Sequence, residues 1–154
     1  MNRFKTVKII LFLVVVPCAF SCKNQNLPAE DVLISLEKTA CFGTCPAYKL
    51  EIFASGLVLF NGISNHEMIG KHKSQLDPQT LREVIEKFKS SSFFNFKNSY
   101  TGDVQDLPTT YLFFKDNGRE KMVQDYYRAP SALKDLEKLV EDLIPVLRWK
   151  KIDQ

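Results

Sequence analysis

The sequence predicts an α+β domain, in which an antiparallel sheet of about five strands carries two helices on one face. Several stretches alternate apolar and polar residues with a period of two, as half-buried strands do. Two other stretches place apolar residues every three or four positions, as amphipathic helices do. Because strands followed by a helix occur twice along the chain, we expect one two-layer domain over residues 31–150.

Four strands are expected before the first helix. Residues 32–36 and residues 48–53 alternate apolar and polar side chains. Gly56 supplies the positive φ that a tight reversal needs, so residues 57–60 should pair with the preceding strand as a hairpin. Residues 67–76 form a weaker strand candidate.

The first helix is expected to begin at Asp77 and Pro78, an N-cap residue followed by a first-turn proline. Apolar residues then recur at i, i+3, i+4 and i+7, which predicts one buried stripe. This stripe consists of Leu81, Val84, Ile85 and Phe88. The helix should end near residues 90–92.

The second half repeats this order. Residues 109–115 are rich in β-branched and aromatic side chains, and Asn117 with Gly118 is a strong hairpin signal before residues 119–127. A final helix follows Pro130, and Pro145 either kinks its last turn or ends it early. Its apolar stripe consists of Leu136, Leu139, Val140, Leu143, Ile144 and Leu147.

The N-terminus has the order of a secretory signal peptide. Basic residues come first, an apolar run over residues 9–16 follows, and small residues precede Cys22. The uncharged stretch over residues 9–22 contains Pro17 and is shorter than the roughly 20 apolar residues of a membrane-spanning helix. We therefore expect residues 1–21 to be a signal peptide.

The ending Ala19-Phe20-Ser21-Cys22 resembles the lipobox of bacterial lipoproteins. That resemblance implies that Cys22 becomes the acylated N-terminus, carrying fatty acids such as palmitate, and several acyl chains give stable anchoring. Residues 22–30 are then expected to form a tether, and the protein is expected in the cell envelope, anchored to the outer membrane of a Gram-negative bacterium. Cleavage without lipidation and a retained anchor are the alternatives.

Charge balance restricts the partners. The chain has 21 basic and 18 acidic residues, and three of the basic ones, Arg3, Lys5 and Lys8, belong to the expected signal peptide. The mature chain is thus balanced in charge, which argues against a nucleic-acid partner and against steering by anionic lipid. The partners expected are the membrane, through the lipid, and an envelope protein or polymer.

Cys41 and Cys45 are expected to form a disulfide, because an exported protein meets an oxidising compartment. Extended chain would separate their Cα atoms by about 13 Å, beyond the roughly 4.4 to 6.8 Å that a disulfide tolerates. The loop must therefore fold back, which Gly43 and Pro46 permit. Closing so small a ring stabilises the fold by about 2 kcal/mol.

Two other uses of these cysteines remain open. A redox pair is one, although such pairs usually have a Cys-x-x-Cys spacing at a helix N-terminus. A zinc site with His66 and His72 is the other, although the two histidines lie about 20 Å apart if they share an extended strand. We expect no metal and no cofactor.

The sequence around the cysteines resembles a family of uncharacterised lipoproteins of Gram-negative bacteria that carry a small domain of unknown function. The resemblance rests on residues 40–48 (ACFGTCPAY), Ser55-Gly56, the turn at residues 106–109 and the helix that ends in Trp149. It covers most of residues 32–149. It implies the location and the domain limits, and it implies no activity.

No catalytic residue is expected, since His66 and His72 lie in no nucleophile or metal motif. Asp103 and Asp106 lack the dense carboxylates of a calcium loop and are expected to bond their own turn. Exposed tyrosines with polar rims are typical of protein interfaces. The binding candidates are Tyr48, Asp106, Tyr126 and Tyr127.

These observations favour a membrane-anchored, non-enzymatic binding or accessory module that uses the cysteine loop and the adjoining sheet surface. The alternative is a periplasmic thiol-disulfide redox protein or sensor that uses Cys41 and Cys45.

Overall fold

The structure is a computed structural model that describes residues 31–152 of the chain. The expected signal peptide, Cys22 and the expected tether lie outside these residues. Neither helix of the described part has the length and apolar character that crossing a membrane requires.

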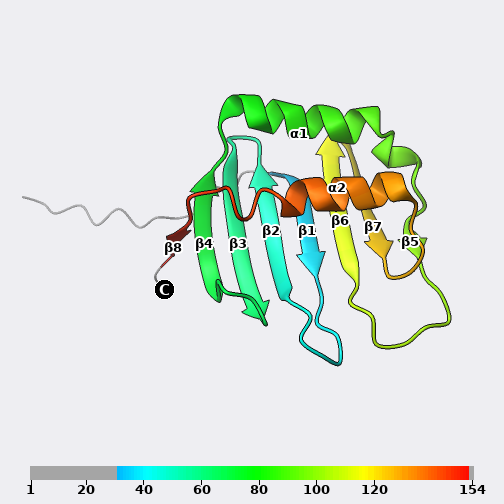
Figure 1. The fold of residues 1–154 in the computed structure, drawn as a ribbon. Helices are drawn as coiled ribbons and strands as arrows, with labels where there is room; N and C mark the ends of the chain where they lie inside the picture. Colours follow the sequence, from blue (N-terminus) through cyan, green and yellow to red (C-terminus); the bar gives the residue numbers. More distant parts are fainter. Residues whose placement is uncertain (1–30, 153–154) are drawn as a thin grey trace, which may run out of the picture.

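Among residues 31–152, eight strands form one sheet in the order β5-β7-β6-β1-β2-β3-β4-β8, and both helices lie on the same face of it (Figure 1). Strands β1 to β4 form a meander, and the β6–β7 hairpin pairs with β1, so β1 lies near the middle of the sheet. The longer strands are β1 (Val32–Lys38), β2 (Ala47–Phe53), β3 (Leu57–Ser64), β4 (Gly70–Gln75), β6 (Thr110–Asp116) and β7 (Arg119–Asp125).

The predicted fold class, an antiparallel sheet of about five strands, is wrong. The described residues form eight strands, and β5 (Ser99–Tyr100) runs parallel to β7, so the sheet is mixed. Strand β5 and the other edge strand, β8 (Lys150–Lys151), have two residues each and therefore show no periodicity. They are strands only because distant backbone groups pair with them, as where Gln124 N–H donates to the Asn98 carbonyl at 2.9 Å.

The hairpin turns follow the chemistry of their residues. Asn117 and Gly118 both have positive φ, 50° and 75°, as a two-residue hairpin of the type I′ class requires. Gly56 has a φ of 80° and lies between β2 and β3. Both predicted hairpins are therefore confirmed.

Helix α1 (Pro78–Ser90) begins as predicted. One carboxylate oxygen of Asp77 accepts the backbone N–H groups of Gln79 and Thr80, each at 3.0 Å. These bonds satisfy donors that have no partner within the helix. The buried residues of α1 are Leu81, Val84 and Phe88.

Helix α2 (Ser131–Glu141) ends before Pro145, so of the two predicted outcomes the early end is the one observed. Residues 142–149 continue as turns and bends across the helix-bearing face and lead to β8 (Figure 1). This segment of eight residues matters for the candidate site because Leu143, Ile144, Leu147 and Trp149 pack with the hydrophobic core, whereas Val146 is exposed.

The core lies between the sheet and the two helices. Phe60, Phe88, Phe93 and Phe114 are its largest fully buried side chains. The rings of Phe88 and Phe114 lie 4.9 Å apart between centroids. Burial of this size stabilises the fold through the hydrophobic effect.

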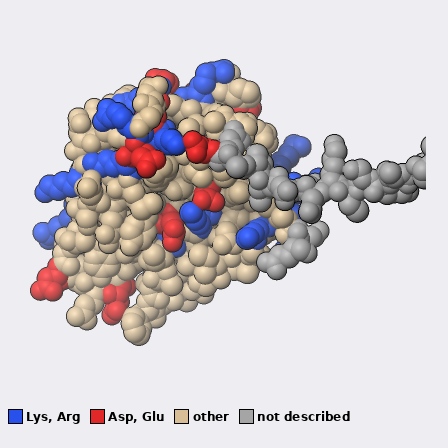
Figure 2. All heavy atoms as spheres, turned by 180° about the vertical axis from the view of Figure 1, so that it is seen from behind, with Lys and Arg blue, Asp and Glu red and all other residues tan. Residues whose placement is uncertain are grey.

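The opposite face of the sheet carries no helix, and Figure 2 shows Lys and Arg side chains next to Asp and Glu side chains over it. Lys49 and Glu51 form an ion pair of 2.6 Å on β2. Charged side chains on an open sheet face hinder the association of two sheets.

Candidate functional site

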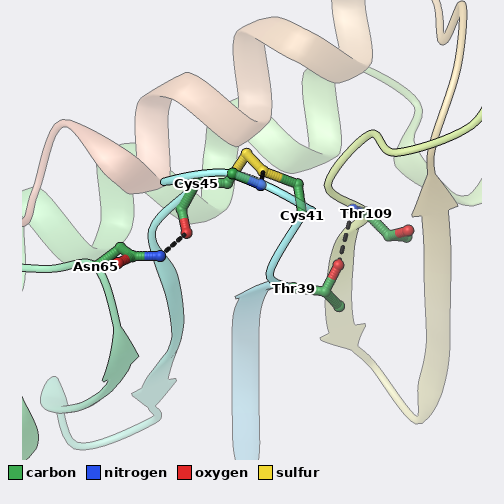
Figure 3. Close-up of a disulfide and its surroundings, with 6 residues drawn as sticks. Thr39, Cys41, Cys45, Asn65 and Thr109 are labelled. Atoms are coloured by element: carbon green, nitrogen blue, oxygen red, sulfur yellow. Dashed lines mark hydrogen bonds between the residues drawn. A yellow bond between two sulfur atoms is a disulfide. The ribbon is translucent and has the colours of Figure 1, made fainter.

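The most distinctive local structure is a covalently closed loop between β1 and β2 (Figure 3). Cys41 and Cys45 form the expected disulfide, with a Cα–Cα distance of 5.6 Å. This lies within the usual range for disulfides. The Gly43 N–H donates to Cys41 Sγ at 3.3 Å inside the ring.

Hydrogen bonds join this loop to its neighbours on both sides (Figure 3). Thr39 N–H donates to the Thr109 carbonyl at 3.0 Å, and Thr109 N–H donates to Thr39 Oγ1 at 2.9 Å. On the other side, Asn65 Nδ2 donates to the Cys45 carbonyl at 3.3 Å. The loop is therefore held in place by the turn after β3 and by the segment before β6.

Phe42 lies between the two cysteines and is 94 % exposed. An exposed phenylalanine leaves its whole apolar surface in water, which is unfavourable for the isolated domain. Because the ring closure and the flanking hydrogen bonds limit the motion of the loop, the backbone that carries Phe42 is largely ordered before any partner binds.

A groove of about 540 Å³ lies next to the loop. One wall comes from Pro46 and the β3–β4 turn, and the other comes from the segment after α2. The lining residues are Pro46, Asn65, His66, Glu67, Met68, Ile144, Pro145, Leu147 and Trp149. A volume of this size, lined mainly by apolar groups with a few polar ones, is typical of binding sites.

Aromatic packing positions the two rings of the groove. The His66 ring lies 4.7 Å from the Phe60 ring and accepts the Met68 N–H at Nδ1, at 3.0 Å. The Trp149 ring lies 5.5 Å from the same Phe60 ring, and its Nε1 donates to the Ile144 carbonyl at 2.8 Å. Since Nδ1 of His66 accepts a hydrogen bond, the proton of the neutral imidazole lies on Nε2.

Tyr48, one of the predicted binding residues, is only 4 % exposed and belongs to the core. Burial, followed by the charge and the hydrogen bond of Glu141, raises the pKa of Tyr48, so its hydroxyl stays protonated. Glu141 also forms an ion pair with Lys38. Tyr48 is therefore a core residue that packs against the groove residue His66, with 5.3 Å between the ring centroids.

The other predicted binding residues lie together, at the segment before β6. Asp106 is exposed and has a φ of 64°. The Tyr126 hydroxyl donates to the Val104 carbonyl at 2.8 Å, and the Tyr127 ring packs closely against Gly102. Both tyrosines are half-buried and hold the segment over residues 101–109 in place, while Asp106 stays accessible.

The arrangement of Cys41, Cys45, His66 and His72 bears on the zinc alternative. Both sulfurs are used in the disulfide, and the two imidazoles pack near the same Phe60 ring, at 4.7 and 6.4 Å. Within residues 31–152, no three His, Cys, Asp or Glu side chains come together as metal ligands do.

The groove has no signature in the sequence that predicts it. Its two walls come from residues 65–68 and 144–149, which lie about eighty positions apart and share no motif. The only feature of the sequence that could have indicated this site is the presence of apolar residues after Pro145. Periodicity assigns these to a helix, whereas the structure ends that helix at Glu141.

Comparison with known proteins gives a family and no activity. Residues 32–144 match a family described as "Domain of unknown function (DUF6438)". No curated protein matches the chain.

Proposed function

Because the match spans most of its length, the chain belongs to the DUF6438 family, and we propose that it is an envelope lipoprotein, anchored through Cys22, that acts as a non-enzymatic binding module. The proposed binding site is the loop–groove surface, which consists of the disulfide loop over residues 39–46 and the adjoining groove. The proposed partner is a second envelope protein.

The observation that carries this proposal is the position of Phe42. It is 94 % exposed on a loop closed by a disulfide and joined by hydrogen bonds to two neighbouring segments. Aromatic side chains that enter a partner's pocket provide much of the binding energy at protein interfaces. A loop that is already ordered loses little conformational entropy on binding.

The groove supports a protein partner. Pro46 belongs both to the disulfide loop and to the groove wall, so one partner can contact Phe42 and the groove together. The groove is lined mainly by Met68, Ile144, Leu147 and the Trp149 ring, with Glu67 and Asn65 as polar groups. An apolar side chain of the partner would fill the groove, and its backbone would bond the polar groups.

The point at which the chain enters the domain also leaves the proposed binding site accessible. The described chain enters β1 where Val32 pairs with Phe53, whereas the loop–groove surface begins at the other end, where Lys38 pairs with Tyr48. Seven strand residues separate these ends by about 20 Å. The chain that leads to Cys22 therefore joins the domain at the end of β1 opposite to the loop–groove surface.

Site-specific photocrosslinking in cells tests the binding site. A photoreactive phenylalanine analogue at position 42 should give one discrete crosslinked envelope protein. Phe42→Ala should weaken binding of that protein by about tenfold or more, since losing a central aromatic anchor usually costs at least 1.4 kcal/mol.

The matched control carries the same analogue at Glu83, an exposed residue of α1 on the helix layer. It should give no such product. Crosslinks of equal yield from both positions, or unchanged affinity of Phe42→Ala, would contradict the proposed site. Loss of radioactive palmitate incorporation in Cys22→Ser tests the anchor separately.

Thiol-disulfide exchange at Cys41 and Cys45 is the second candidate function. It is supported by the Gly43 N–H, which lies 3.3 Å from Cys41 Sγ and would stabilise a thiolate there after reduction. Phe42, Gly43 and Thr44 are exposed, so a second thiol can approach. A reduction potential low enough to resist glutathione would argue for a purely structural disulfide.

A further inference from the structure

The sheet edge formed by β4 and β8 is strongly basic. Its charged residues are Lys71, Lys73, Arg148, Lys150 and Lys151, which we call the basic edge. The contributing stretches, residues 68–76 and 143–152, contain no Asp or Glu. The two stretches lie far apart in the sequence and meet only because β8 pairs with β4.

The strand register brings like charges together. Lys73 lies directly opposite Lys150, and Ile152 N–H continues the ladder by donating to the Lys71 carbonyl at 2.9 Å. Residues opposite each other on antiparallel strands share a face, as do residues two apart on one strand, so Lys71, Lys73 and Lys150 project from the same face. The pairing of β8 with β4 thus places Lys71 and Lys150 on one face of the same sheet edge, with Lys151 next to them in the chain.

The basic edge gathers several basic residues that form no ion pair with a described carboxylate. Six other lysines form ion pairs with carboxylates, namely Lys38, Lys49, Lys89, Lys115, Lys134 and Lys138. Within residues 31–152, no carboxylate lies within ion-pair distance of Lys71, Arg148, Lys150 or Lys151. All four of these side chains are exposed.

The expected tether is long enough to bring this edge to a membrane. Ten residues of extended chain between Cys22 and Val32 reach about 33 Å. Strand β8 lies four strand spacings from β1, which is about 19 Å. The domain can therefore lie with the basic edge on the membrane while the lipid stays inserted.

We propose that the basic edge binds the anionic phospholipid headgroups of the membrane that holds the lipid anchor. This inference rests on the proposed function for the presence of that membrane. Each lysine near an anionic membrane strengthens binding by about fivefold, so several of them orient a domain that the lipid alone leaves free to rotate. This local excess of positive charge is not apparent from the overall charge of the mature chain, which is balanced.

Trp149, the only tryptophan of the chain, lies between Arg148 and Lys150 and serves as an energy-transfer donor. The lipidated chain is reconstituted into vesicles that carry a dansyl acceptor on their headgroups. Transfer should rise about twofold when phosphatidylglycerol is added to phosphatidylcholine vesicles, and high salt should reverse the rise. The triple variant Lys71→Gln, Lys150→Gln, Lys151→Gln should show no rise.

The matched control replaces three exposed basic residues elsewhere, Arg82, Lys87 and Lys97, by Gln. The control variant should keep the rise in energy transfer. The proposal is overturned if both variants lose this rise equally, or if transfer is equal in neutral and anionic vesicles. Reversal by inorganic phosphate at constant ionic strength would assign the edge to free phosphate and would also overturn it. Flotation of the protein with neutral vesicles tests the lipid anchor alone. If the chain carries no anchor, energy transfer from Trp149 to anionic vesicles still tests the basic edge.

Discussion

Two buried carboxyl groups face each other between β7 and α2. Asp125 is 3 % exposed and Glu137 is 4 % exposed, and both contact Lys134. Glu137 Oε1 has no hydrogen-bond donor among the described residues. A proton on Glu137 removes this deficiency, because a protonated carboxyl can donate to Asp125.

Stability should therefore depend on the titration of Glu137. Burial raises its pKa from 4.5 to about 7, although Lys134 opposes the shift. Because the folded state holds the proton more tightly, this group's contribution is fully present below about pH 4.5 and is lost as pH rises to about 7. Between about pH 5 and pH 8 the loss should be roughly 2 to 3 kcal/mol.

Glu137→Gln should abolish this loss, since the amide is neutral and can donate to Asp125. Urea unfolding at both pH values measures the effect. Asp135→Asn, an exposed site on the same helix, is the control and should keep the pH dependence. The account is wrong if Glu137→Gln and the unmodified chain lose equal stability between the two pH values.

At the scale of single elements, the β3–β4 connection depends on one glycine. Gly62 pairs with Tyr48 on one side and Gly70 on the other. A Cβ atom at Gly62 would lie 1.7 Å from the Met68 carbonyl oxygen, so only glycine allows the turn to fold back over β3. This turn forms one wall of the groove.

Gly62→Ala should destabilise the domain by roughly 1 to 3 kcal/mol, because backbone must move to relieve the clash. It should also change the fluorescence of Trp149 on the opposite wall. Gly43→Ala is the control, since its Cβ would meet nothing nearer than Cys41 Sγ at 3.8 Å. Denaturant unfolding of both variants measures the difference, and equal stabilities would show that the turn adapts.

At the scale of the whole molecule, the core and the disulfide have separate roles. The core consists of side chains from the sheet and both helices, whereas the disulfide closes only a short loop at one end. A ring of this size adds about 2 kcal/mol through the unfolded state. We therefore expect the disulfide to order the loop, and we expect the core to maintain the fold without it.

The double variant Cys41→Ser, Cys45→Ser should thus fold with an unchanged circular dichroism spectrum and lose about 2 kcal/mol in urea unfolding. The loop should become sensitive to protease while the strands stay protected. The unmodified chain treated with reductant should behave identically, which excludes an effect of the serines. Global unfolding of the double variant would refute this division of roles.

Local patterns in the sequence determined the helix start at Asp77, the Asn117–Gly118 hairpin and the pairing of Cys41 with Cys45. In each case the interacting groups lie within a few residues, so their energetics depend on neighbours in the chain. Only the tertiary structure decided the mixed eight-stranded order within residues 31–152, the groove and the basic edge. These features join segments tens of residues apart, and two-residue strands such as β5 and β8 have no pattern until distant backbone groups bond to them.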